Sequence, residues 1–167
     1  MKTKNQKIIL FFLVLFIAMI ILLINNPFRA DKTESEKNVG LNVGQLAPNF
    51  ELKDIEGKSI SLKQFRNDKA VILNFWASWC AFCKEEMPLL EKISKENKDK
   101  IIVIGINLQE NPEVAIKFAK ELGINYPILF DQDSKVTNIY NVRTQPTTYF
   151  IDKEGIIFNL DTIENTI

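Results

Sequence analysis

The sequence predicts an α/β domain whose central sheet is flanked by helices. Two apolar runs, residues 71–76 and 101–108, have the length and composition of buried central strands. A stretch with helical spacing of its apolar residues follows each run, and such alternation is typical of this fold class. The chain has 167 residues, of which 46% are hydrophobic and 25% charged, which suits one globular domain with an appendage.

The first predicted elements of this domain are short. Residues 49–53 and 58–60 are predicted to be two strands of a hairpin, joined by a turn at 54–57. Ser61 is placed to cap a short helical turn that ends at Phe65. The run at 71–76 is then the first buried strand, interrupted only by Asn74.

The later elements alternate between helix and strand. The helix predicted at 80–97 carries Met87, Leu90 and Ile93 on one face and contains Pro88, which should kink it. The remaining predicted elements are a strand at 101–108, a helix at 113–122, a strand at 127–130, a helix at 134–140, and a hairpin formed by 147–151 and 155–158.

The N-terminus carries an apolar segment. Residues 8–24 are uncharged, which is long enough for a short membrane span, and three lysines but no acid precede them. We therefore expect residues 1–7 to be a cytoplasmic tip, 8–24 a transmembrane anchor, 25–42 a tether, and 43–167 the folded domain outside the membrane. A cleaved signal peptide is the alternative, but Phe28 interrupts the small-residue pattern before Ala30 that cleavage needs.

The formal charge is zero but unevenly distributed. Four of the 21 basic residues and none of the 21 acidic residues lie in residues 1–30, so the remainder carries four more acids than bases. A mildly acidic domain is unsuited to binding nucleic acid. Export would also place the domain where cysteine pairs tend to oxidise, so a cysteine pair that acts as a reductant there must be reduced again by a membrane component.

The only two cysteines, Cys80 and Cys83, open the helix predicted at 80–97. A thiol at a helix N-terminus faces unpaired N–H groups, which favour the thiolate, and a second thiol one turn later can close a disulfide. Zinc is disfavoured because the chain has no histidine and no third cysteine. A purely structural disulfide would close too small a loop to stabilise much. The favoured interpretation of the pair is therefore redox chemistry by thiol–disulfide exchange, which needs neither a metal nor a cofactor.

Several segments resemble the thioredoxin superfamily. Residues 74–83, with the sequence NFWASWCAFC, resemble its active-site segment. Other segments resemble the ResA/TlpA branch of membrane-anchored thiol–disulfide oxidoreductases, and the similarity covers roughly residues 43–158. These segments are GQLAPNF at 44–50, DIEG at 54–57, EMP at 86–88 and QPTTYFID at 145–152. The resemblance implies a thioredoxin-like fold with an N-terminal β-hairpin and, within 109–140, a central αβ insert.

The resemblance also assigns roles to the cysteines and their surroundings. Cys80 corresponds to the nucleophile and Cys83 to the resolving thiol, joined as a Cys80–Cys83 disulfide when oxidised. Pro146 corresponds to a cis-proline facing the pair, which would turn the backbone of Gln145 toward an extended client peptide. Trp79, which flanks the pair, is expected to be exposed and to contact the client.

Glu86 corresponds to an acid that this branch keeps near its cysteines, where it would relay protons during exchange. The alternative is a solvated glutamate on the helix surface, because Glu85 and Glu91 are close in sequence. Asn74 stands where many cytoplasmic thioredoxins carry a buried aspartate. Since asparagine cannot shuttle a proton, another acid is needed, which favours Glu86; a hydrogen-bonded core amide is the other interpretation of Asn74.

The implied function is an extracytoplasmic reductant of disulfides in exported proteins. Apocytochrome c is the leading client, and a membrane thiol-transfer protein would be the electron donor. The alternatives are a peroxiredoxin, which the paired cysteines oppose, and a non-catalytic adaptor with a thioredoxin fold. The chain departs from the family pattern in having Phe82 where proline is common. It also departs in having only residues 160–167 for its C-terminal helix, about two turns.

Overall fold

The computed structural model describes residues 38–158, together with Leu15, Phe16 and Met19. The chain divides into two units, Met1–Lys37 and Asn38–Ile167. Within the described residues, no helix is both long and apolar enough to cross a membrane. Most of the anchor predicted at 8–24 and the short C-terminal helix predicted at 160–167 lie outside these residues.

The second unit is built on a seven-stranded mixed sheet with the strand order β2-β1-β5-β4-β3-β6-β7. Strands β3, β4 and β5 are parallel, whereas β6 runs antiparallel to β3, and β7 to β6. At the other edge β1 and β2 form the predicted hairpin. The strands are β1 (Glu51–Lys53), β2 (Ser59–Ser61), β3 (Ala70–Trp76), β4 (Ile101–Leu108), β5 (Ile128–Asp131), β6 (Thr147–Ile151) and β7 (Ile157–Phe158).

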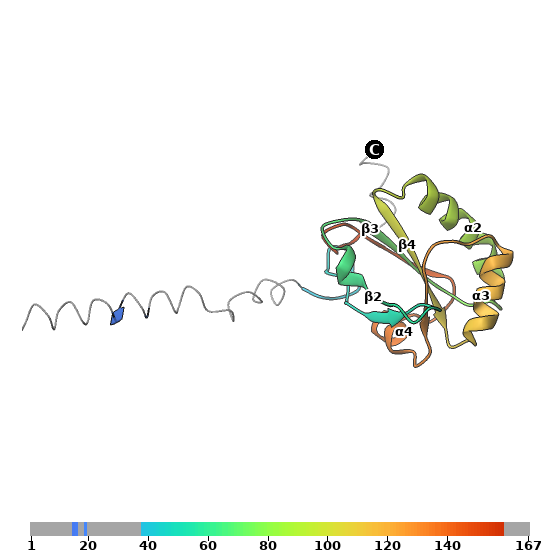
Figure 1. Ribbon diagram of the computed structural model, residues 1–167, viewed down its shortest axis with the longest axis horizontal. Helices are drawn as coiled ribbons and strands as arrows, with labels where there is room; N and C mark the ends of the chain where they lie inside the picture. The colour runs from blue at the N-terminus through green and yellow to red at the C-terminus, as the bar shows by residue number, and fades with distance from the viewer. Residues whose placement is uncertain (1–14, 17–18, 20–37, 159–167) are drawn as a thin grey trace, which may run out of the picture. The chain divides into compact units, whose positions relative to one another are not determined.

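Helices cover both faces of this sheet (Figure 1). Helices α2 (Ala81–Glu96) and α3 (Pro112–Glu121) contribute buried residues to the hydrophobic core on one face, which contains Trp76 and both cysteines. Helix α4 (Lys135–Ile139) and the 3-10 turn η2 (Leu62–Phe65) contribute to the core on the other face, around Phe75 and Tyr140. Because β3 lies between the two cores, all but the first of its residues are buried.

Gly105 makes room for the core under α2. It lies in the middle of β4, opposite Asn74 of β3. A Cβ atom at this position would come within 2.8 Å of Trp76 Nε1 and 3.1 Å of Tyr126 Cε2. Only glycine therefore leaves room here for the Trp76 indole, which stacks on Phe118 with 5.8 Å between ring centroids.

The folded unit begins before residue 43, where the sequence analysis places the start of the domain. The backbone N–H of Gly40 donates to the carbonyl of Leu46, and that of Leu46 donates to the carbonyl of Asn38. Leu46 also forms an antiparallel bridge with Ile156, next to β7. Residues 38–42, assigned to the tether, therefore belong to the compact unit, where they pair with Leu46, which is itself bridged to Ile156 near the far end of the sequence.

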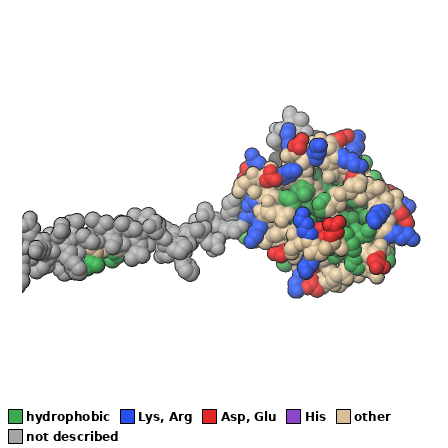
Figure 2. Space-filling view, in the orientation of Figure 1, with side chains coloured by type: hydrophobic (Ala, Val, Ile, Leu, Met, Phe, Trp, Pro, Cys, Tyr) green, Lys and Arg blue, Asp and Glu red, His purple; other side chains and the backbone are tan. Residues whose placement is uncertain are grey.

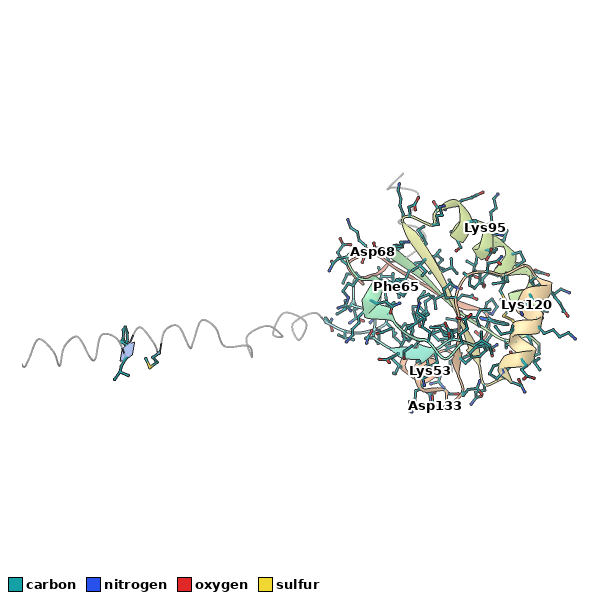
Figure 3. The ribbon with its side chains drawn as sticks, in the orientation of Figure 1. Lys53, Phe65, Asp68, Lys95, Lys120 and Asp133 are labelled. Carbon is teal, nitrogen blue, oxygen red and sulfur yellow. A yellow bond between two sulfur atoms is a disulfide. The ribbon has the colours of Figure 1, made fainter. Side chains whose placement is uncertain are left out.

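Charged side chains of both signs are interspersed on the face of the domain shown in Figure 2. In Figure 3, Lys95 projects from α2 and Lys120 from α3. Two carboxylates, those of Glu91 and Asp131, are buried instead.

Glu91 of α2 is only 6% exposed and joins this helix to the loop before β5. Its carboxylate accepts hydrogen bonds from Asn125 N at 2.8 Å, Asn125 Nδ2 at 2.9 Å and Tyr126 N at 3.2 Å, and it pairs with Lys95 Nζ at 2.9 Å. Burial raises the pKa of Glu91, but the hydrogen bonds from Asn125, Lys95 and Tyr126 outweigh it, so the pKa lies below its ordinary value.

Replacing Glu91 with glutamine is expected to lower the free energy of unfolding at pH 7 by about 1–3 kcal/mol, because buried donors lose their charged acceptor. Since folding lowers this pKa, the stabilisation is present above the unfolded value of about 4.3 and is lost as the pH falls through the folded value. Denaturant titrations of both proteins at pH 7 and pH 3 should show the difference shrinking at pH 3. Glu96→Gln, on the exposed face, is the control and should change little. A difference of equal size at both pH values would contradict the prediction.

Candidate active site

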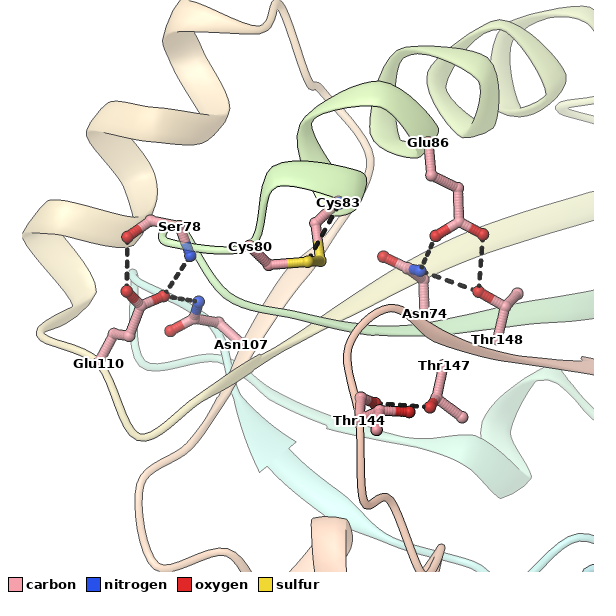
Figure 4. The surroundings of a disulfide bond; sticks show 10 residues. All are labelled: Asn74, Ser78, Cys80, Cys83, Glu86, Asn107, Glu110, Thr144, Thr147 and Thr148. Carbon is pink, nitrogen blue, oxygen red and sulfur yellow. Dashed lines mark hydrogen bonds between the residues drawn. A yellow bond between two sulfur atoms is a disulfide. The ribbon is translucent and has the colours of Figure 1, made fainter.

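The two cysteines lie where β3 passes into α2. Cys80 is the N-cap of α2, and the backbone N–H of Cys83 donates to Cys80 Sγ at 3.1 Å. The sulfurs are bonded, with an S–S distance of 2.15 Å and 5.3 Å between the Cα atoms (Figure 4). When the bond is reduced, the same N–H and the helix dipole favour a thiolate at Cys80.

The two sulfur-bearing residues differ in accessibility. Cys80 is 7% exposed, whereas Cys83 is 0% exposed and packs in the core with Trp76 and Met87. Both residues are thus largely buried, and only Cys80 keeps some contact with solvent. Among the described residues no cluster of histidine, cysteine, aspartate and glutamate could hold a metal ion.

Glu86 lies on the Cys83 side of the disulfide and faces the sheet (Figure 4). It is half-buried, and its carboxylate accepts hydrogen bonds from Asn74 Nδ2 at 2.9 Å and Thr148 Oγ1 at 3.0 Å. Asn74 Nδ2 also lies 2.9 Å from Thr148 Oγ1. The carboxylate therefore joins α2 to β3 and β6 on the Cys83 side of the disulfide.

A second carboxylate lies on the Cys80 side, and the sequence analysis did not select it. Glu110, in the loop between β4 and α3, accepts hydrogen bonds from Ser78 N at 2.7 Å, Ser78 Oγ at 2.5 Å and Asn107 Nδ2 at 2.7 Å (Figure 4). A signal for this site was present, because Asn107 interrupts the apolar run of β4 as Asn74 interrupts that of β3. Both asparagines are 0% exposed.

The predicted client-contacting residues lie at the same edge of the sheet. The Gln145–Pro146 bond is cis, and both residues are half-buried. They directly precede β6, whose first residue, Thr147, pairs with Phe75 near the end of β3. Trp79 is 71% exposed. These three residues thus lie near the end of β3, at the edge of the sheet where Cys80 caps α2.

Comparison with known proteins identifies the family. A family model described as AhpC/TSA family matches residues 43–159. Thioredoxin-like protein YneN of Bacillus subtilis is 42% identical over 129 residues, which are 75% of this chain and 75% of that protein. Thiol-disulfide oxidoreductase ResA of Bacillus cereus is 37% identical over 130 residues, 77% of this chain and 70% of that protein. The chain belongs to the ResA-like branch of the thioredoxin superfamily.

A solved structure agrees with this assignment. The thioredoxin domain of a thiol-disulfide oxidoreductase from Bacteroides vulgatus matches this ResA-like protein with a TM-score of 0.66 and 27% identity, over 76% of this chain and 96% of that one. The predicted thioredoxin-like α/β fold is therefore confirmed. This ResA-like protein is a thiol–disulfide oxidoreductase, with Cys80 and Cys83 as its CxxC pair.

Proposed function

We propose that this ResA-like protein reduces disulfides in exported proteins on the outer side of the cytoplasmic membrane. The observation that carries the proposal is a disulfide-forming cysteine pair at the start of α2, in which only Cys80 keeps some exposure, with a hydrogen-bonded carboxylate on the same helix. The apolar residues 8–24 would anchor the chain, and the lysines before them would keep the N-terminus in the cytoplasm. Apocytochrome c is the client class that we put first.

Two exchange steps would pass two electrons to the client. The Cys80 thiolate attacks one sulfur of the client disulfide, and the other client sulfur leaves as a thiolate. Cys83 then gives its proton to Glu86 and attacks Cys80 Sγ. This step forms the Cys80–Cys83 disulfide and releases the second client sulfur, which takes up a proton. A membrane thiol-transfer protein with its own dithiol would restore the reduced pair.

The client would lie across the edge formed by Trp79, Gln145 and Pro146. An extended peptide can pair with the backbone of Gln145 as an added strand, while the exposed Trp79 indole supplies apolar contact. Phe82 is also 71% exposed and lies between the cysteines in sequence, so it extends the same apolar surface. These contacts would hold a client disulfide against Cys80.

Intact cells provide the test. With the protein held reduced, a membrane-impermeant maleimide should label Cys80 before lysis, while a cytoplasmic thiol protein in the same cells stays unlabelled. Deleting the gene should lower covalently haem-bound cytochrome c, and either the wild-type gene or an added dithiol should restore it. Labelling only after lysis would overturn the proposed location, and an unchanged cytochrome c level would overturn the proposed client.

A further inference from the structure

Glu110 is held at the active site by several hydrogen bonds, yet neither exchange step uses it. Its carboxylate oxygens accept three hydrogen bonds, two from Ser78 and one from the fully buried Asn107. Asn107 pairs with Trp76 at the end of β3, so the carboxylate spans the ends of two neighbouring central strands. A solvated loop glutamate would make no such set of contacts.

The backbone around Glu110 is fixed as well. Gln109 has a positive φ of 48° at the end of β4, which turns the chain sharply. The carbonyl of Glu110 accepts a hydrogen bond from Gln132 Nε2 at 2.7 Å, and Asn111 caps α3 through Glu113 N at 2.8 Å. The Glu110 side chain therefore projects from a loop whose backbone is held by hydrogen bonds at Glu110 itself and at the residues that follow it.

Ser78 connects the Glu110 carboxylate to the turn that precedes Cys80. It lies two residues before Cys80 in the turn that also carries the exposed Trp79, and Cys80 N donates to Ala77 O at 3.2 Å. Figure 4 shows Glu110 and Ser78 on the Cys80 side of the disulfide, opposite Glu86. Since exchange requires the attacking sulfur to approach along a defined line, the position of this turn bears directly on the rate.

We propose that Glu110 is a positioning residue for Cys80, acting through Ser78 to fix the turn that presents the nucleophile to the client disulfide. The inference rests on the proposed role of Cys80 as the attacking thiol. The effect is geometric, so an uncharged side chain that keeps the hydrogen bonds should also keep the rate. Glutamine can do so: its carbonyl oxygen can accept from Ser78 N and Asn107 Nδ2, which share one carboxylate oxygen of Glu110, and its amide can donate to Ser78 Oγ.

The test measures attack by the reduced full-length chain, in detergent, on a small aromatic disulfide and on an oxidised peptide, across pH. Glu110→Ala should lower the second-order rate constant about tenfold at every pH. Glu110→Gln should lie within about twofold of wild type. Glu113→Ala, an exposed glutamate three residues on, is the matched control and should match wild type.

A double-mutant cycle tests the route through Ser78. Ser78→Ala removes one of the three hydrogen bonds and should lower the rate constant for attack by a few fold. In the double variant with Glu110→Ala, it should lower the rate constant no further than Glu110→Ala alone does. If Glu110→Ala does not fold, the rate constants of Ser78→Ala and Glu110→Gln still test the proposal. A wild-type rate in Glu110→Ala or Ser78→Ala, a Glu110→Gln rate as low as that of Glu110→Ala, or additive effects would overturn the proposal. Failure of the nucleophile assignment would show separately, as attack that persists in Cys80→Ser.

Discussion

Replacing Cys83 with alanine is expected to stop turnover and to leave Cys80 covalently linked to its client. The first exchange step needs only Cys80, whereas release of the client needs the buried sulfur of Cys83. Multiple-turnover disulfide reduction should therefore fall by about a thousandfold or more. The adduct should appear on non-reducing gels of cell extracts, disappear on reduction, and yield the client's identity by mass spectrometry.

Cys80→Ala is the matched control for this trap. It retains one thiol, that of Cys83 on α2, which is 0% exposed, so it should form little or no adduct with folded clients. Comparable adduct in both variants would show that the attacking sulfur has been misassigned. Undiminished turnover in Cys83→Ala would show that a second thiol from another molecule resolves the mixed disulfide.

Replacing Glu86 with glutamine is expected to slow exchange about a hundredfold while leaving the melting temperature nearly unchanged. Glutamine has the same shape, so it can still accept from Asn74 Nδ2, and the Thr148 hydroxyl can rotate to suit it. It cannot take up the proton that Cys83 must lose, and a positioned acid or base typically contributes about 10²–10⁴ in rate.

Rapid-mixing measurements on a defined disulfide peptide would test this prediction by comparing the rate constants of wild type and Glu86→Gln at one pH. Glu85→Gln, adjacent in sequence but exposed, should behave like wild type. An identical rate in Glu86→Gln would show that Glu86 only connects α2 to the sheet.

The central elements were predictable because their patterns are strong. An apolar run with one asparagine gave β3, and the helix predicted at 80–97 matches α2 with Cys80 and Asn97 as its caps. The ends of the two strands in the edge hairpin were predicted less accurately, because a strand of three residues is too short for a clear alternation of apolar and polar residues. Asn49, predicted to be in the first strand, instead accepts hydrogen bonds from Ser61 Oγ and Lys63 N through its side chain.

The candidate site was predictable only in part. Motif similarity pointed to the cysteines, Glu86 and Pro146, all of which the fold brings to one edge. Glu110 escaped notice because a charged residue in a loop usually faces water, and only the fold shows Ser78 and Asn107 beside it. Thr148 was missed for a similar reason: its partner Glu86 is 62 residues away in sequence.

Thr148 has a consequence for the timing of the reaction. It lies two residues after Pro146, on the strand whose leading end would meet the client, and its hydroxyl touches the acid that would receive the Cys83 proton. In the proposed reaction, a client that displaced β6 would also displace the Thr148 hydroxyl relative to the Glu86 carboxylate. Client binding and proton transfer from Cys83 would then be coupled through this one hydrogen bond.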